Sequence, residues 1–316
     1  MKVSIISSSN TWIEGLAAEQ LQKTAQLPGI VRAVGMPDLH PGKDAPIGAA
    51  FASCDTIYPH LVDRDIGCGI GLWQLDLQVR KTSADRIEKR LQQDLEGPWQ
   101  GPLEETLEAS GMARSTDFDA SSMGTIGHGN HFAEISRLHK IIDHEKSAQI
   151  GLRKEALYLL VHSGSRGLGE SIFEAHARRH GKSGLKADSI EAIDYISAHD
   201  HALKWAFVNR KIIAERFMNA LNTTGKPIAD VSHNHVRKET IGAESLWIHR
   251  KGAASTSDGL ILIAGSRGTL SYLVEASGDQ TANLASAAHG AGRKWKRSEC
   301  RARIERIQTK SGLLKT

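Results

Sequence analysis

Residues 62–77 read VDRDIGCGIGLWQLDL, a glycine-rich turn that leads into an apolar run. The turn's glycines free the backbone, so Asp65 and Cys68, three positions apart, can point at one place. A hard carboxylate oxygen beside a soft thiolate sulfur suits a divalent transition metal. A buried cysteine can equally be plain filler, and the GxG spacing lacks the full dinucleotide pattern that would predict NAD binding. The segment therefore predicts a strand entered through a candidate metal site.

Short apolar runs bounded by glycine, serine or proline predict further strands on both sides of this segment. In the first 80 residues these are KVSIIS (2–7), RAVGMPD (32–38), IGAAFAS (47–53) and GIGLWQLDL (69–77). Later in the chain they are LYLLVHSG (157–164), which follows a short helix, ADVSHNHV (229–236), ESLWIHR (244–250) and GLILIAGS (259–266).

Two apolar periodicities predict helices. Ser83 caps a helix whose apolar residues recur every fourth position before Gly97 closes it, and residues 97–124, rich in Gly, Pro, Ser and Asp, read as an insertion or long loop. The longest helix spans 190–221 before Gly225 and Pro227, with one buried face of Ile193, Ala206, Phe207, Ile213, Phe217 and Leu221. Strands and helices do not alternate regularly, so we expect an α+β fold, in a single domain over residues 1–316, rather than a doubly wound sheet.

Composition narrows the class of protein. The chain has 316 residues, three cysteines, and 15 histidines against 16 Phe, Trp and Tyr together. An odd number of cysteines (Cys54, Cys68 and Cys300) fits a reducing compartment, and the many imidazoles favour metal chemistry. The first residues carry an apolar run too short for a signal peptide, so we expect a cytoplasmic protein.

The net charge of +4 is unevenly spread. Between His289 and Lys310, eight Lys and Arg face only Glu299 and Glu305, a net +6 in one segment. Such a segment can supply phosphate contacts for a nucleic acid, and it can also be a solvated helix end.

Three histidines share a setting. His131 lies in GHGNHFAE, His162 in LLVHSGSRG and His233 in DVSHNHV, each beside an apolar run and flanked by Gly, Ser or Asn. Each alone is more often a core or surface histidine. Together with Asp65 and Cys68 they give five donors, more than one tetrahedral zinc needs. The set would suit two ions that share Cys68, because a thiolate sulfur has lone pairs to spare.

Glycine-rich basic turns predict phosphate binding nearby. SGSRG (163–167) offers backbone N–H groups beside Arg166, and HRKGA (249–253) and GSRG (265–268) repeat the pattern with Arg250, Lys251, Ser266 and Arg267. In AAHGAGRKWKR (287–297), His289 sits in a glycine turn, as an accessible imidazole would if it attacked phosphorus.

Eight motifs in this order resemble the RtcB family of RNA ligases, from about residue 31 to about 303. They are MPDLHPGKDAPIGAAF, DIGCGIG, GNHFAE, HSGSRG, SHNHV, RKGA, GSRGTLSY and HGAGRKWKR. The resemblance implies an α+β domain with central sheets, flanking helices and a deep polar cleft. It also implies an enzyme that uses GTP and manganese to join RNA ends bearing a 2′,3′-cyclic phosphate or 3′-phosphate to 5′-hydroxyl ends.

The same resemblance implies roles for individual residues. His289 would take GMP from GTP, and Asp38 would orient its imidazole. Asn130, Arg166 and Asn234 would hold phosphate, Glu134 and Ser266 would face the guanine nucleotide, and Lys251 would contact RNA or phosphate. Two manganese ions would be held by Asp65, Cys68, His131, His162 and His233.

Two departures from the family pattern matter. GSRG stands where the family usually has GSMG, which places Arg267 beside the nucleotide pocket and favours the divergent RNA-repair branch over the tRNA-splicing branch. The chain ends at SGLLKT, where we expect the segment that closes the guanine pocket to be missing. Two alternatives therefore stay open: a metal-dependent 2′,3′-cyclic phosphoesterase that does not ligate, and a catalytically impaired RNA-end-binding protein.

Overall fold

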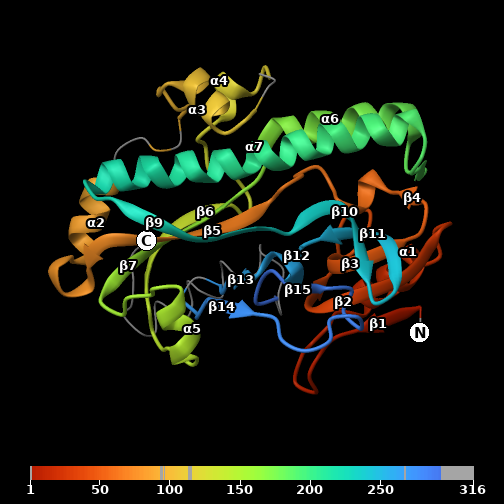
Figure 1. Ribbon diagram of the computed structural model, residues 1–316, viewed down its shortest axis with the longest axis horizontal. Coiled ribbons are helices and arrows are strands. Elements are labelled where there is room, and N and C mark those ends of the chain that lie inside the picture. The colour runs from red at the N-terminus through yellow and green to blue at the C-terminus, as the bar shows by residue number, and fades with distance from the viewer. Residues whose placement is uncertain (1, 93–94, 96, 113–115, 267, 293–316) are drawn as a thin grey trace.

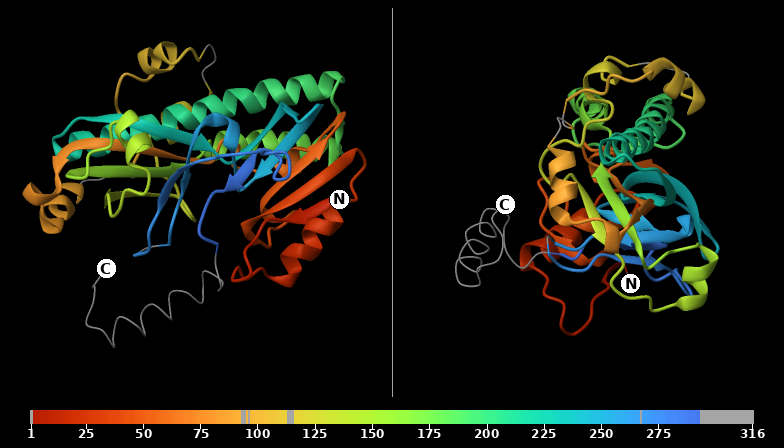
Figure 2. Two further views of the ribbon diagram at one scale, coloured as in Figure 1. Left: turned by 60° about the horizontal axis from the view of Figure 1, so that its bottom comes forward. Right: turned by 90° about the vertical axis from the view of Figure 1, so that its left-hand side faces the viewer.

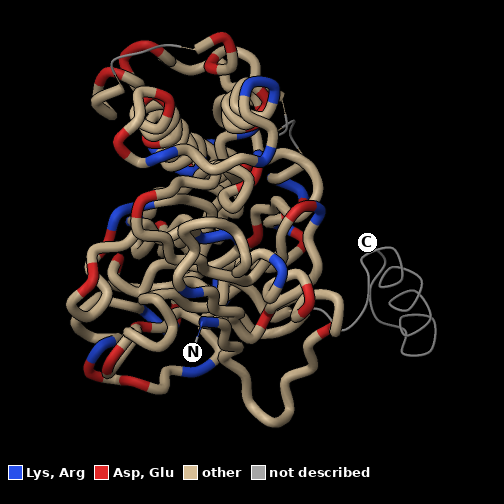
Figure 3. The backbone as a smooth tube through the Cα atoms, turned by 90° about the vertical axis from the view of Figure 1, so that its right-hand side faces the viewer, with Lys and Arg blue, Asp and Glu red and all other residues tan. Residues whose placement is uncertain are grey.

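The computed structural model describes residues 2–92, 95, 97–112, 116–266 and 268–292 (Figure 1). Arg267, Cys300, the basic residues from Arg293 onward and the final SGLLKT lie outside the described residues. In the side view of Figure 3, acidic and basic residues of the described chain are interspersed. Because residues 293–316 are not described, the predicted basic segment stays a prediction from sequence.

A four-stranded antiparallel sheet forms the centre of the molecule, in the order β6 (Phe132–Arg137), β7 (Ala156–Ser163), β5 (Gly69–Gln78), β9 (Gly225–Ser232). Helix α7 (Ile190–Leu221) covers one face and β13 (Leu260–Ile263) lies on the other (Figure 1). Alternate side chains of β7 point to the two faces of the sheet, and because both faces are covered the strand is buried along its whole length. Leu157, Leu159 and Val161 pack with α7, whereas Tyr158 and Leu160 pack with Leu262 of β13.

A second sheet has five strands, in the order β1 (Val3–Ile5), β2 (Ile30–His40), β3 (Ile47–Ser53), β11 (Glu244–Lys251), β10 (Asn234–Ile241). Only the β1–β2 pair within it is parallel. Helix α1 (Gly15–Thr24) packs on one face, and the paired strands β12 (Ala253–Ser255) and β15 (Ser286–Ala288) pack near the other. Largely antiparallel sheets with helices outside them confirm the α+β prediction.

Two helices lie side by side on one side of the sheets, α7 and α6 (Arg166–His180) (Figure 2). The Ser189 hydroxyl caps α7 by accepting the Ala192 amide. The predicted span 190–221 is confirmed. The helix ends because Asn222 adopts a left-handed conformation and not because of Gly225 and Pro227, which lie in β9.

Part of the predicted buried face of α7 is also wrong. Ile193 is 60% exposed and Phe207 is 50% exposed, because the buried stripe runs through Ala192, Ala202 and Trp205 instead. Ile213 is 1% exposed and packs on the four-stranded sheet, as predicted.

The two isoleucines of α7 give a matched stability test. Ile213→Ala should lower the free energy of unfolding by about 2–5 kcal/mol, because it leaves a cavity against the sheet. Ile193→Ala should change it by no more than about 0.5 kcal/mol, because the side chain is largely in solvent. Urea unfolding followed by circular dichroism measures both. Equal losses would contradict the burial pattern of α7.

Three other predicted elements are corrected. Helix α2 (Ala84–Leu91) is capped by Ser83 as predicted, but it ends well before Gly97. The predicted loop 97–124 contains the short helices α3 (Leu103–Ala109) and α4 (Asp119–Ser122), which lie over α7 (Figure 1). The predicted strand 229–236 is the end of β9 and the start of β10, separated at His233.

The remaining elements are short. Helix α5 (His144–Gln149) precedes β7 as predicted, β14 (Tyr272–Glu275) pairs with β13, and β4 (Thr56–Ile57) pairs with β8 (Leu185–Lys186). Three 3-10 turns complete the set, at Pro59–Leu61, Val79–Lys81 and Thr256–Asp258. In the described part of the chain, no helix is both long enough and apolar enough to cross a lipid bilayer.

Candidate metal centre

The predicted ligands meet because their segments lie at one end of the four-stranded sheet. Strand β5 runs antiparallel to β7 and to β9, so the turn before β5 is beside the ends of both neighbours. Strand β6 is antiparallel to β7, and Phe132 at its start pairs with His162. The turn that carries Asp65 and Cys68 therefore meets His131 before β6, His162 in β7 and His233 after β9.

Cys68 is at the centre of the cluster. Its Sγ atom lies 3.4 Å from Nε2 of His131 and 3.3 Å from Nε2 of His162. Nε2 of His162 is in turn 3.3 Å from Nε2 of His233, and Nε2 of His131 is 2.8 Å from Oδ2 of Asp65. All five predicted ligands are thus joined through short contacts, with the sulfur between two histidines.

Burial and neighbouring charges shift the pKa values of four of the five predicted ligands. Burial lowers the pKa of His162 and His233 well below the ordinary value, and neighbouring histidines add to the effect, so both imidazoles are neutral and carry a free lone pair. Burial raises the pKa of the Cys68 thiol, and the charge of Asp65 raises it further. Burial, the largest single influence, works to raise the pKa of Asp65, but the hydrogen bond and charge of His131, together with Cys68 and His162, outweigh it and the net shift is downward.

A set of converging nitrogen, sulfur and oxygen donors is suited to a divalent transition metal. The ligand atoms of Cys68, His131 and His162 lie within 4.8 Å of one another, a spacing that could hold one ion. Asp65 and His233 extend the set on either side. The residues present therefore fit the metal centre that the sequence predicts.

Two glycines make room for the cluster. A Cβ atom at Gly164 would overlap the Asp65 carboxylate, and one at Gly127 would overlap the Arg166 guanidinium. Gly127 also has φ of +99°, a conformation that side chains disfavour. These positions explain why the GHGNHFAE and HSGSRG motifs carry glycine beside their histidines.

His289 lies next to the cluster, directly after β15. Its ring centroid is 4.6 Å from that of His233, and its Nδ1 atom is 2.8 Å from Oδ2 of Asp38. The same carboxylate oxygen accepts the backbone amides of His289 and Gly290. Asp38 therefore fixes the turn and places a carboxylate oxygen close to Nδ1 of the ring, with Nε2 as the other imidazole nitrogen.

The predicted phosphate-binding residues differ in their surroundings. Arg166 begins α6, donates from Nε to the Thr125 hydroxyl at 3.2 Å, and lines a pocket of about 180 Å³ together with His128. Asn130 is exposed beside His131. The Asn234 amide is engaged with the backbone: Nδ2 donates to the Asp65 carbonyl and Oδ1 accepts the amide of Gly252. The geometry therefore gives Asn234 a structural role in holding the Asp65 turn.

Lys251 and Arg250 are both enclosed. Lys251 is 2% exposed, and its Nζ atom lies 2.8 Å from Oδ2 of Asp63. Arg250 is fully buried and paired with Glu239, so the expectation that it handles phosphate is not supported. Its guanidinium has no open side toward a ligand, because it also binds the backbone carbonyls of residues 284 and 285.

The two residues predicted to face the guanine nucleotide lie on separate strands. Glu134 is in β6, on the sheet face that carries His162, and its carboxylate accepts the Ser136 hydroxyl at 3.3 Å. Ser266 is exposed in the turn after β13. That turn is beside the His289 loop, because Ala264 forms a bridge with Gly290.

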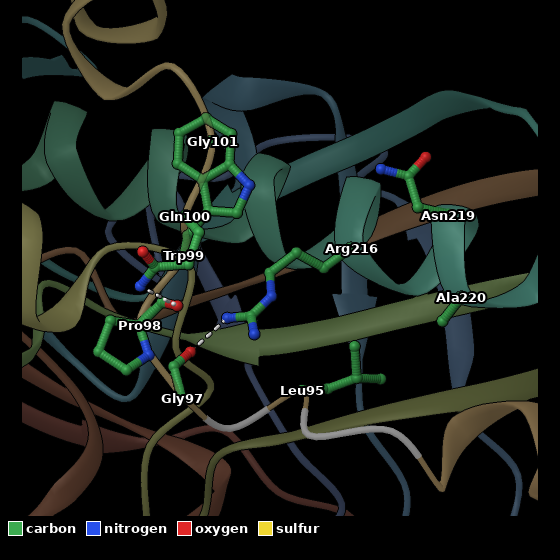
Figure 4. A pocket seen from close by; sticks show the side chains of 9 residues that line it. All are labelled: Leu95, Gly97, Pro98, Trp99, Gln100, Gly101, Arg216, Asn219 and Ala220. Carbon is green, nitrogen blue, oxygen red and sulfur yellow. Dashed lines mark hydrogen bonds between the residues drawn. The ribbon is translucent and has the colours of Figure 1, made fainter.

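One hollow in the described surface is separate from the cluster. It has a volume of about 650 Å³ and lies between the C-terminal part of α7 and the segment that follows α2 (Figure 4). Arg216 spans it by donating to the Gly97 carbonyl at 2.6 Å. None of the predicted site residues that the structure describes lines this hollow.

Sequence reasoning missed two residues behind the cluster, Asn209 and Arg210 in α7. Both are fully buried. An amide and a charged group at adjacent positions of a core helix are a usable sequence signal, because such groups are buried only when paired. The predicted apolar face of α7 did not include them.

The chain is similar in sequence to several known proteins. The family model described as tRNA-splicing ligase RtcB matches residues 20–100 and 98–315. The RNA-splicing ligase RtcB2 of Escherichia coli is 47% identical over 314 residues, which cover 99% of this chain and 82% of that protein. RtcB1 of the same strain is 28% identical, over 92% of this chain and 80% of that protein. The tRNA-splicing ligase RtcB of Thermococcus kodakarensis is 29% identical, over 87% of this chain and 75% of that protein.

Proposed function

Since the chain belongs to the RtcB family of RNA-splicing ligases, we propose that it is a GTP- and manganese-dependent RNA ligase. Its substrates would be broken RNA with a 2′,3′-cyclic phosphate or 3′-phosphate at one end and a 5′-hydroxyl at the other. The observation that carries the proposal is the position of His289, oriented by Asp38 and 4.6 Å, ring to ring, from a ligand of the five-donor cluster.

Each part of the site would contribute one element of the chemistry. Manganese ions bound by the five donors would neutralise phosphate oxygens and polarise phosphorus. Nε2 of His289 would attack the α-phosphorus of GTP, forming a histidine–GMP bond while pyrophosphate leaves. Asp38 would stabilise the positive charge that the imidazole gains.

The second half of the reaction would use the RNA ends. The 3′-phosphate would take GMP from His289, and the 5′-hydroxyl would then attack that phosphate and release GMP. A cyclic end would first need to be opened by water. Arg166, which lines the small pocket together with His128, would hold the phosphate through paired N–H groups.

The proposed cellular role is RNA repair in the cytoplasm, on tRNA or another structured RNA. Its support is the higher identity to RtcB2 than to RtcB1 of one Escherichia coli strain, together with the GSRG motif. This pattern favours the divergent branch that the sequence predicts.

The proposal is tested with two RNA strands that carry a cyclic phosphate and a 5′-hydroxyl. A joined product should form with GTP and manganese together and should be lost when either is omitted. Opening of the cyclic end without GTP, with no joined product, would identify a phosphoesterase instead. Salt-sensitive RNA binding without any chemistry would identify an RNA-end-binding protein.

A further inference from the structure

One buried arginine of α7 lies directly behind the candidate metal centre. Arg210 is fully buried, and its guanidinium pairs with Asp230 of β9: Nη2 is 2.6 Å and Nε is 2.8 Å from Oδ1. Such a pair is weak evidence for stability, because desolvation offsets much of the attraction between two buried charges. The other contacts of the guanidinium therefore decide what it does.

Those contacts all go to residues directly beside a candidate ligand. Nη1 donates to the Gly67 carbonyl at 2.7 Å and to the Ser163 carbonyl at 2.9 Å, and Nη2 lies 3.4 Å from the Ser232 hydroxyl. The ligands one position away are Cys68, His162 and His233. One planar group thus touches three of the four segments that supply the cluster.

The geometry of a strand explains the effect of these contacts. Successive side chains of a strand point to opposite faces. The side chains of Ser163 and Ser232 face α7, so His162 points away from the helix toward Cys68, and His233, directly after β9, contacts His162. The guanidinium therefore holds the strand ends from the rear of the sheet, and its rigid fork fixes them relative to one another.

The adjacent residue does the same for the fourth segment. Oδ1 of Asn209 accepts the Gly124 amide at 2.7 Å, in the loop that leads to His131. Its Nδ2 donates to the carbonyls of Thr125 at 3.3 Å and Gly164 at 3.2 Å. Helix α7 thus supports every ligand-bearing segment through two consecutive side chains.

We infer that Arg210 is a positioning residue of the metal centre, which holds the backbone beside Cys68, His162 and His233 so that their ligand atoms converge. The inference rests on the proposed metal site. Groups that orient metal ligands typically change metal affinity by about 10–100-fold when they are removed.

The test substitution removes the forked guanidinium of Arg210 but keeps a positive charge at that position. Arg210→Lys can still pair with Asp230, but a single ammonium cannot reach all three segments. Cobalt(II) titration, read by the thiolate-to-cobalt absorption band, should show affinity weaker by about 10–100-fold and an altered band. Arg250→Lys is the matched control, since Arg250 is equally buried and paired with Glu239 but contacts no neighbour of a ligand. It should bind cobalt like the wild type.

A second variant covers the case in which Arg210→Lys does not fold. Arg210→Met with Asp230→Leu removes both charges, an exchange that is often neutral or favourable for stability. It should show the same loss of affinity. Wild-type cobalt binding by either folded variant, or an equal loss in Arg250→Lys, would overturn the inference.

A readout without metal separates this inference from the proposed function. Absence of the band in the wild type would count against the metal site itself. Amide hydrogen exchange of the metal-free protein would then test whether Arg210 holds the backbone of the site. The amides to follow are those of Gly67, which donates to the Asn234 carbonyl, and His233, which donates to the Cys68 carbonyl. Arg210→Lys should speed exchange at both by about tenfold, and unchanged exchange would overturn the inference.

Discussion

His289→Ala is expected to abolish covalent labelling of the protein by GTP that is radioactive at the α-phosphate. The wild type should acquire an acid-labile label in the presence of manganese. Among the described histidines, only His289 lies both beside the metal cluster and with its ring against the Asp38 carboxylate. Loss of a nucleophile removes the covalent step, so RNA joining should fall by at least about a thousandfold.

Two further variants sharpen this prediction. His144→Ala, at an exposed position in α5, is the control and should be labelled like the wild type. Asp38→Asn keeps the size of the side chain but removes its charge, and should slow labelling by about 100-fold or more. Equal labelling of His289→Ala and the wild type would rule out His289 as the nucleophile.

Cys68→Ala is expected to remove the thiolate-to-cobalt absorption band and to weaken metal binding by at least about 100-fold. The Sγ atom is the contact shared by His131 and His162, so its loss should disturb every ion in the cluster. Joining of RNA ends should fall with metal occupancy. Metal content measured by mass spectrometry, together with the joining assay, would follow both effects.

The chain offers its own control for this experiment. Cys54 is also a free cysteine but is exposed, so Cys54→Ala should leave metal binding, the absorption band and activity unchanged. Persistence of the band in Cys68→Ala, or its loss in Cys54→Ala, would contradict the proposed ligand set. RNA binding that survives in Cys68→Ala would show that RNA affinity is independent of the metal centre.

Local sequence signals were sufficient where short-range geometry controls the outcome. Ser83 and the apolar period predicted a capped helix, and the apolar run 157–164 predicted a strand, which the structure buries along its whole length. The same signals failed at 229–236, where the alternating pattern continues through His233 although the chain passes there from one sheet to the other. Periodicity reports which faces are buried, and it does not report which sheet buries them.

The sequence by itself determined the α+β class, the family and the five candidate ligands, because each depends on residue type and local spacing. Only the tertiary structure decided that these ligands converge, because convergence follows from the antiparallel register of β5 with β7 and β9. It also decided that Arg210 supports them from behind and that Arg250 is enclosed. Both are charged residues in apolar surroundings, and their partners, Asp230 and Glu239, are identified only by the packing of the folded chain.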